Sequence, residues 1–129
     1  MNRRIAYLVG NHQFRHDSSL STLVGVPNDL LALQRILADP TQGRFETRVF
    51  SDASSGDIKV AIEEELGSVG SGDLMLIHYS GHGKLDRMGN LCLATADTRA
   101  AALYATSIPM HLDEASTRSS DGLHVTYAI

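Results

Sequence analysis

Apolar runs alternate with segments of helical periodicity along the first eighty residues, and this alternation constrains the fold more than any other feature. Residues 5–9 and 73–80 are nearly continuous apolar runs, and residues 45–50 end in an apolar pair. Such runs are typical of strands that are buried on both faces of a parallel sheet. Because strands that alternate with helices favour right-handed crossovers, the pattern predicts an α/β fold around a mostly parallel sheet.

Two segments between these strands have the spacing of amphipathic helices. The first has its apolar stripe at Leu30, Leu33 and Leu37, and the second at Ile58, Ala61, Ile62, Leu66 and Val69. We expect Asn28 or Asp29 to cap the first helix and Asp39-Pro40 to end it, because a residue before proline avoids the helical region. Residues 54–57 are typical of a start for the second helix, and residues 70–72 break it.

Shorter elements are predicted after residue 80. A polar turn at residues 84–90 leads to residues 91–94, which we interpret as part of a small hairpin. Residues 109–119 are expected to form another helix, and the alternation over residues 123–129 is typical of a fourth strand. Because no interdomain linker interrupts these elements, we expect one domain over residues 1–129.

The composition argues against several functional classes. With a net charge of -4 and scattered basic residues, the chain is poorly suited to nucleic acid, since phosphate binding depends on clustered Lys and Arg. The N-terminal apolar run is too short for a signal peptide or a membrane span, so no membrane partner is expected. The single cysteine, Cys92, cannot form an intrachain disulfide, which favours a reducing compartment. Together these features predict a cytoplasmic protein.

Polar residues follow two of the predicted strands at the edge where parallel α/β sheets gather their functional groups. Gly10-Asn11 follows the first strand, and residues 80–83, Ser-Gly-His-Gly, follow the third. His82 lies between two glycines, which permit a sharp turn and a close approach of other chain segments. An imidazole at this position is suited to proton transfer near neutral pH. From the residues alone, a loop histidine beside two strand-ending glycines is an equally good interpretation.

The residues around His82 resemble a known family. Residues 73–83 are similar to the catalytic-histidine strand of caspase-like cysteine peptidases (peptidase C14), particularly bacterial caspase homologues and metacaspases. Residues 5–11 resemble the family's first strand, 23–29 its entry into the first helix, and 91–98 the strand after the histidine. The resemblance extends from about residue 4 to residue 118. It implies a caspase-like three-layer αβα sandwich with a mostly parallel central sheet.

The resemblance also implies roles for individual residues. His82 would be the acid/base of a Cys-His dyad that cuts a polypeptide substrate. The Gly83 backbone N–H would donate to the oxyanion of the intermediate. Ser80 matches a position near the pocket for the residue before the cut, and Asn11 at the neighbouring strand end is expected to bind substrate with it. Alternatively, the Ser80 hydroxyl caps backbone groups at the end of its strand.

The nucleophile for such a dyad is missing from these residues. Caspase-type cysteines follow the histidine by roughly 50 residues, which from His82 is a position beyond Ile129. Cys92 lies inside an apolar strand, where cysteines are generally inert. We therefore expect a chain that is truncated before the catalytic-cysteine turn and inactive by itself. Its parent protein would carry the cysteine, and further domains or a homo-oligomer are compatible with this interpretation.

Two other functions stay open at this point. A catalytically inactive caspase-like interaction module would keep a peptide groove without the chemistry. A flavodoxin-like ligand-binding domain would bind its ligand at Gly10-Asn11, and the histidine motif would then be incidental. Gly10-Asn11 lacks the further glycines of a dinucleotide fingerprint, so a nucleotide ligand is poorly supported.

No cofactor is predicted, and calcium is the one weak metal candidate. Metacaspases resemble one another in binding calcium through carboxylates after the histidine loop, and calcium prefers such oxygen ligands. Asp97, Asp113 and Glu114 fall in the corresponding region. Solvated surface carboxylates are the default interpretation of these three residues.

Overall fold

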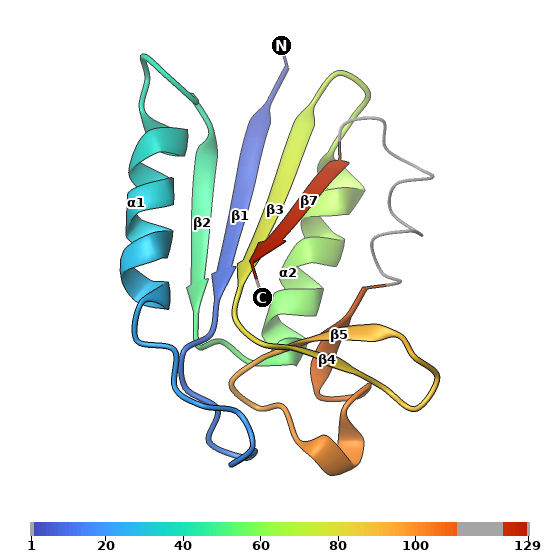
Figure 1. The fold of residues 1–129 in the computed structure, drawn as a ribbon. Coiled ribbons are helices and arrows are strands. Elements are labelled where there is room, and N and C mark those ends of the chain that lie inside the picture. Colours follow the sequence, from blue (N-terminus) through green and yellow to red (C-terminus); the bar gives the residue numbers. More distant parts are fainter. Residues whose placement is uncertain (1, 111–122, 129) are drawn as a thin grey trace.

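The computed structural model describes residues 2–110 and 123–128 (Figure 1). In chain order the elements are β1 (Arg4–Gly10), α1 (Val26–Ala38), β2 (Glu46–Ser51), α2 (Ser55–Ser68), β3 (Leu74–Ser80), β4 (Gly83–Leu85), β5 (Leu91–Ala94), the 3-10 helix η1 (Ala100–Ala102), β6 (Ser107–Pro109) and β7 (Leu123–Ala128). Strands and helices alternate as far as β3, which confirms the predicted α/β fold. None of the described helices is long and apolar enough to cross a membrane.

Four parallel strands form the main sheet in the order β2-β1-β3-β7. Their register brings the carboxyl ends to one edge, where Gly10 lies opposite both Ser51 and Ser80. Ser80 in turn lies opposite Ala128 of β7. A second, antiparallel sheet in the order β4-β5-β6 lies beyond this edge (Figure 1). The predicted fourth strand and the predicted small hairpin are both confirmed.

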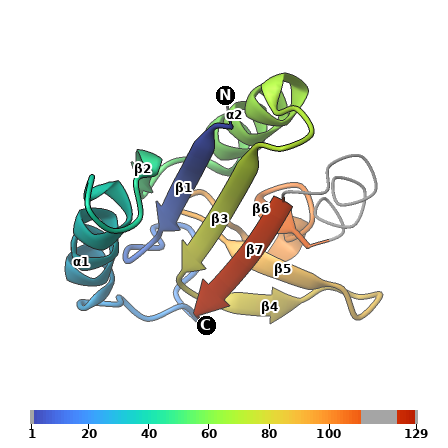
Figure 2. The ribbon, with the colours of Figure 1, turned by 90° about the horizontal axis from the view of Figure 1, so that it is seen from above.

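Helices cover both faces of the main sheet (Figure 2). Successive side chains of β1 point to opposite faces, as the pleat requires. One core joins β1 to α1 through Ala6, Leu8, Val26 and Leu30. The other joins the sheet to α2 and the small sheet through Ile5, Tyr7, Val9, Phe50, Ile58, Ala61, Met75, Ile77, Tyr79, Leu93 and Ile108. These three layers confirm the predicted αβα sandwich.

Gly10 lets α1 approach the carboxyl end of β1 closely. A Cβ on this residue would overlap the Leu30 side chain and lie 2.9 Å from Val26 Cγ1. Glycine is therefore needed where the first turn of the helix packs on the end of the strand. This close approach positions the segment that leaves β1 at the carboxyl edge.

The start of α1 differs from the prediction. Its N-cap is Gly25, without a side-chain cap, so Asn28 and Asp29 lie inside the first turn instead of capping it. Pro27 accounts for the difference, because its fixed φ and missing N–H suit the first helical turn. The predicted end of this helix before Pro40 is confirmed.

The two later helix predictions have different outcomes. Ser54 caps α2 by accepting a hydrogen bond from the Asp57 N–H at 3.2 Å, as predicted. The helix predicted over residues 109–119 is wrong at its start, because Pro109 belongs to β6 and pairs with β5. Proline is tolerated there because β6 is an edge strand of the small sheet. Residues 111–119 of that prediction lie outside the described residues.

Candidate active site

His82 lies at the carboxyl edge of the main sheet, between β3 and β4, on the same edge as Gly10. Its backbone is held from the core side by Tyr79. The hydroxyl oxygen of Tyr79 lies 2.9 Å from the His82 carbonyl oxygen and 2.5 Å from the Ala94 carbonyl oxygen, and its single proton is shared between these two acceptors. Burial raises the pKa of Tyr79, so its hydroxyl keeps the proton that this contact requires.

Gly81 allows the histidine segment to pack directly on that tyrosine. A Cβ on Gly81 would overlap the Tyr79 hydroxyl oxygen and lie 2.7 Å from Tyr79 Cζ. It would also lie 3.3 Å from the Asn11 carbonyl oxygen. The glycine before the histidine is therefore explained by close packing, which is one of the two reasons anticipated from the sequence.

The imidazole of His82 is held from the other side by the β1–α1 loop (residues 11–25). His82 Nε2 lies 2.9 Å from the Ser21 carbonyl oxygen. The Phe14 ring packs against the imidazole with the ring centroids 5.0 Å apart. Sequence reasoning missed both contacts: a backbone carbonyl has no residue-type signature, and Phe14 lies far from His82 in the chain. The single phenylalanine of this loop, in a stretch rich in polar residues, is the signal that could have suggested Phe14.

The β1–α1 loop is closed at its base by backbone contacts and one carboxylate. The Leu23 N–H donates to the His12 carbonyl oxygen at 2.9 Å, which joins the two ends of the loop. Asp52 Oδ1 accepts hydrogen bonds from the His12 and Gln13 N–H groups at 2.9 Å and 3.2 Å. Asp52 Oδ2 lies 2.6 Å from His12 Nδ1. These contacts fix the base of the loop at the end of β1, from where the loop extends to His82.

Ser80 and Asn11 both lie at the predicted strand ends, but neither side chain is accessible. Ser80 is buried, and its Oγ lies 3.0 Å from His78 Nε2. Asn11 is fully buried, and its carboxamide makes no hydrogen bond to a described residue. The Asn11 N–H donates to the Ser80 carbonyl oxygen at 3.0 Å, which links the two strand ends. Both side chains are thus buried at the strand ends, and the substrate-binding role expected for them stays a prediction.

The single cysteine belongs to the small sheet. Cys92 is fully buried in β5, where it lies opposite Lys84 of β4. Its Sγ is 3.8 Å from the Asn90 carbonyl oxygen. Gly83, the expected oxyanion donor, is the first residue of β4 and is half-buried. A buried thiol in an apolar strand behaves as a small hydrophobic side chain, as predicted for Cys92.

Asp97, one of the three suggested calcium ligands, is held by hydrogen bonds at the start of α2. Its carboxylate accepts hydrogen bonds from the Ser55 N–H at 2.8 Å, the Ser55 hydroxyl at 2.9 Å and the Thr95 hydroxyl at 2.5 Å. Burial raises the pKa of Asp97, but these hydrogen bonds outweigh it and hold the pKa below its ordinary value. The carboxylate therefore caps the first turn of α2.

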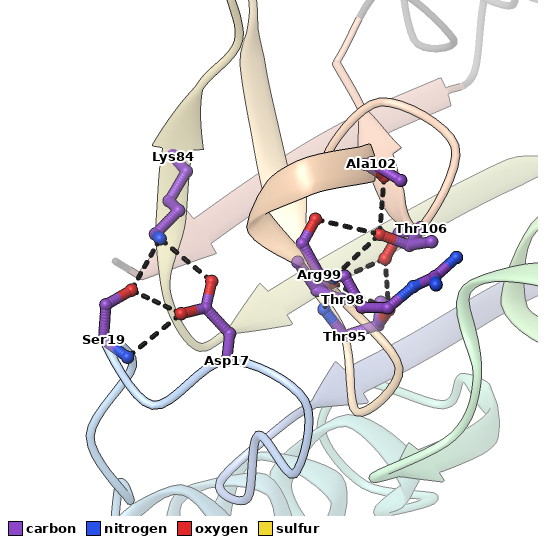
Figure 3. Close-up of polar contacts among 8 residues, drawn as sticks. All are labelled: Asp17, Ser19, Lys84, Thr95, Thr98, Arg99, Ala102 and Thr106. Carbon is purple, nitrogen blue, oxygen red and sulfur yellow. Dashed lines mark hydrogen bonds and ion pairs between the residues drawn. The ribbon is translucent and has the colours of Figure 1, made fainter.

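Other observations give no support to a metal site near Asp97. Among residues 2–110, no three His, Cys, Asp or Glu side chains are grouped so as to hold a metal ion. Asp113 and Glu114 lie outside the described residues. The threonine hydroxyls beside Asp97 are engaged within the fold: Thr95 Oγ1 donates to Asp97, and Thr98 Oγ1 donates to the Thr106 carbonyl oxygen at 2.6 Å (Figure 3).

The arrangement as a whole is that of a parallel αβα sandwich with an oriented histidine at its carboxyl edge. A family model described as the caspase domain matches residues 3–112, and the chain belongs to this family. The resemblance deduced from the residues around His82 is thereby confirmed, and the flavodoxin-like alternative is not supported. A search of curated proteins gives no match for the chain.

Proposed function

We propose that this domain serves a caspase-type cysteine endopeptidase in which His82 is the acid/base. The observation that carries the proposal is the contact between His82 Nε2 and the Ser21 carbonyl oxygen, 2.9 Å apart. A carbonyl oxygen can only accept a hydrogen bond, so Nε2 is the nitrogen that carries the proton. In the neutral imidazole, Nδ1 is then the free proton acceptor.

A thiol within reach of Nδ1 completes the chemistry. Nδ1 takes the proton from the thiol, and the thiolate attacks the carbonyl carbon of the substrate peptide bond. The Ser21 carbonyl oxygen stabilises the imidazolium that forms, and the Gly83 N–H donates to the oxyanion. The imidazolium then protonates the leaving amine as the C–N bond breaks, and water hydrolyses the remaining thioester to release the cysteine.

The nucleophilic cysteine is proposed to follow β7 in the complete reading frame. β7 is parallel to β3 and adjacent to it, and Ala128 lies opposite Ser80. A segment that continues from β7 therefore leaves the sheet at the same edge as His82, one strand away. Cys92 does not serve this role because its thiol is fully buried. Ser80 and Asn11 are proposed to shape the floor of the substrate site by linking β1 to β3.

The test uses the protein expressed from its complete reading frame. Fluorogenic peptides with an acidic or a basic residue before the cut are offered in parallel, so that either preference is detected. We expect hydrolysis that a thiol alkylating agent abolishes and that His82→Ala lowers by at least about a hundredfold. His16→Ala, which removes an exposed histidine from the β1–α1 loop, is the matched control. Hydrolysis that survives His82→Ala would contradict the proposal.

A second candidate, the inactive interaction module, is favoured by the burial of the only thiol among residues 1–129. It predicts that the complete protein binds peptide without cutting it. Residues 1–129 alone are expected to hydrolyse no peptide under either proposal. Turnover by this chain that disappears in His82→Ala would instead assign the nucleophile to Cys92.

A further inference from the structure

We propose that Lys84 and Asp17 are positioning residues that clamp the β1–α1 loop onto β4 and thereby keep the Ser21 carbonyl oxygen on His82. The catalytic meaning of this clamp rests on the function proposed above. The clamp itself is a statement about which contacts orient the imidazole, and it can be tested without turnover.

The clamp joins the two segments that meet at the imidazole. Lys84 Nζ lies 3.0 Å from Asp17 Oδ2 and 2.8 Å from Ser19 Oγ (Figure 3). Lys84 is two residues after His82, in the strand β4 that directly follows the histidine. Asp17 is four residues before Ser21, in the same loop. The Lys84–Asp17 ion pair and the His82–Ser21 contact therefore both join the β1–α1 loop to residues 82–84.

Burial makes the Asp17 carboxylate dependent on its partners. Its side chain is only 5% exposed, whereas that of Lys84 is 28% exposed. Hydrogen bonds from Ser19 and Lys84 hold the pKa of Asp17 below its ordinary value, so the carboxylate is charged at neutral pH. A charged group with so little access to water needs its partners nearby. Loss of the ammonium would therefore drive Asp17 outward, toward water, and carry the loop with it.

The turn at Asp17 couples a displacement of Asp17 to the position of Ser21. The Leu20 N–H donates to the Asp17 carbonyl oxygen at 3.1 Å, which makes residues 17–20 one turn immediately before Ser21. Leu20 is buried against Phe14 and Ala94, so the turn also rests on the hairpin beside His82. A displacement of Asp17 thus moves the carbonyl that holds the imidazole.

A second turn in the chain has the same local chemistry without the ion pair. Asp39 accepts hydrogen bonds from the Thr41 N–H and the Thr41 hydroxyl, both at 2.7 Å. The Gln42 N–H donates to the Asp39 carbonyl oxygen at 3.1 Å, as Leu20 does to Asp17. No lysine or arginine is ion-paired with Asp39 among the described residues. Asp39→Asn is therefore the matched control for Asp17→Asn, and Lys59→Gln, at the only other lysine, is the control for Lys84→Gln.

The first experiment measures the imidazole in residues 1–129 by ¹⁵N NMR. The wild-type His82 is expected to show a protonated Nε2 and an unprotonated Nδ1 in its neutral form. In Lys84→Gln and Asp17→Asn, the ¹⁵N chemical shifts of the two ring nitrogens are expected to move toward the average of two exchanging tautomers. Hydrogen exchange of the Leu20 and Leu23 amides is expected to rise roughly tenfold. Lys84→Arg should retain much of the wild-type signature, because a guanidinium can donate to the same carboxylate.

The result that overturns the clamp is a wild-type tautomer and wild-type loop exchange in both Lys84→Gln and Asp17→Asn. An equal change in Lys59→Gln or Asp39→Asn would overturn it as well, because the effect would then not depend on the ion pair. Amide signals of β1, β2 and β3 report whether each variant is folded. If Lys84→Gln fails to fold, Lys84→Arg and Asp17→Asn carry the test.

The second experiment measures turnover in the complete protein. Lys84→Gln is expected to lower kcat by roughly tenfold to a hundredfold with KM little changed, because a misoriented base affects the chemical step. If the NMR signature of His82 changes in Lys84→Gln and Asp17→Asn but the wild-type protein shows no turnover, the clamp is supported and the proposed peptidase function is contradicted. Turnover and a His82 signature that are both unchanged in Lys84→Gln would contradict the clamp and leave the peptidase standing.

Discussion

Two regions hold His82 from opposite sides, and they use different chemistry. On the core side, Tyr79 and Gly81 fix the backbone of the histidine through buried, closely packed contacts. On the loop side, Ser21 orients the imidazole through one backbone carbonyl, and the Lys84–Asp17 pair holds that loop. The comparison teaches that the place of the histidine and the direction of its ring are set separately. The place of the histidine depends on the folded core. The direction of its ring depends on the polar contacts of the β1–α1 loop, which can open locally.

The largest effect is expected from crowding the core side. Gly81→Ala places a methyl group on the Tyr79 hydroxyl, which cannot move because it is buried and bonded to two carbonyls. We expect a loss of about 2–3 kcal/mol in the free energy of unfolding, measured by urea denaturation. Gly56→Ala on α2 meets nothing within 4 Å and should be neutral or stabilising. Equal stability of the two variants would contradict the close packing.

A smaller loss is expected when the core contact is deleted instead of crowded. Tyr79→Phe removes the hydroxyl that serves the His82 and Ala94 carbonyls, at a cost of about 1–2 kcal/mol. Thermal unfolding should show this loss, together with faster exchange of the Ala94 amide, which donates to the His82 carbonyl. Tyr7→Phe removes a hydroxyl that makes no hydrogen bond to a described residue and should change little. A Tyr79→Phe protein as stable as Tyr7→Phe would show that the core side does not hold the histidine backbone.

The loop side is expected to contribute much less to global stability. Lys84→Gln should cost no more than about 1 kcal/mol in urea denaturation, because the ammonium is partly exposed. The same variant should be cut faster by proteases within residues 12–23, while the main sheet stays protected. A loss as large as that in Gly81→Ala would mean that the two sides are not separate.

The smallest effect concerns pH, and it belongs to the loop side alone. The pKa of Asp17 is held below its ordinary value of 3.8, first by Ser19 and then by Lys84. A carboxyl with a lowered pKa in the folded state stabilises above its unfolded pKa, and this contribution disappears as the pH falls through the folded pKa. The stability difference between the wild type and Asp17→Asn should therefore be constant from pH 5 to pH 7 and shrink below about pH 4. A difference that grows on acidification would contradict the assignment.

Much of the fold could be predicted from the sequence because its strands and helices depend on local periodicity. The apolar runs predict β1 and β3, and the glycines around His82 predict a close approach at the carboxyl edge. The start of α1 could not be predicted from its Asn28-Asp29 pair, because Pro27 occupies the first turn and moves the cap to Gly25. Periodicity also did not separate a helix from the edge strand that ends at Pro109.

The contacts that orient the imidazole could not be predicted, and the reason is physical. Ser21 acts through its carbonyl oxygen, which every residue has, so no side-chain pattern marks it. Lys84 and Asp17 are 67 positions apart and meet only because the β1–α1 loop folds back over the hairpin. The burial of Asn11 likewise depends on what covers the strand end, not on the residue itself.

The place of Lys84 on β4 has a consequence for the behaviour of the molecule in concentrated solution. β4 is a three-residue strand at the border of the small sheet, with Leu85 exposed beside the lysine. Strand borders with free amides and carbonyls tend to recruit strands from other molecules, and a lysine there discourages such recruitment. A lysine on this border strand is therefore expected to discourage neighbouring copies of the protein from adding to the hairpin.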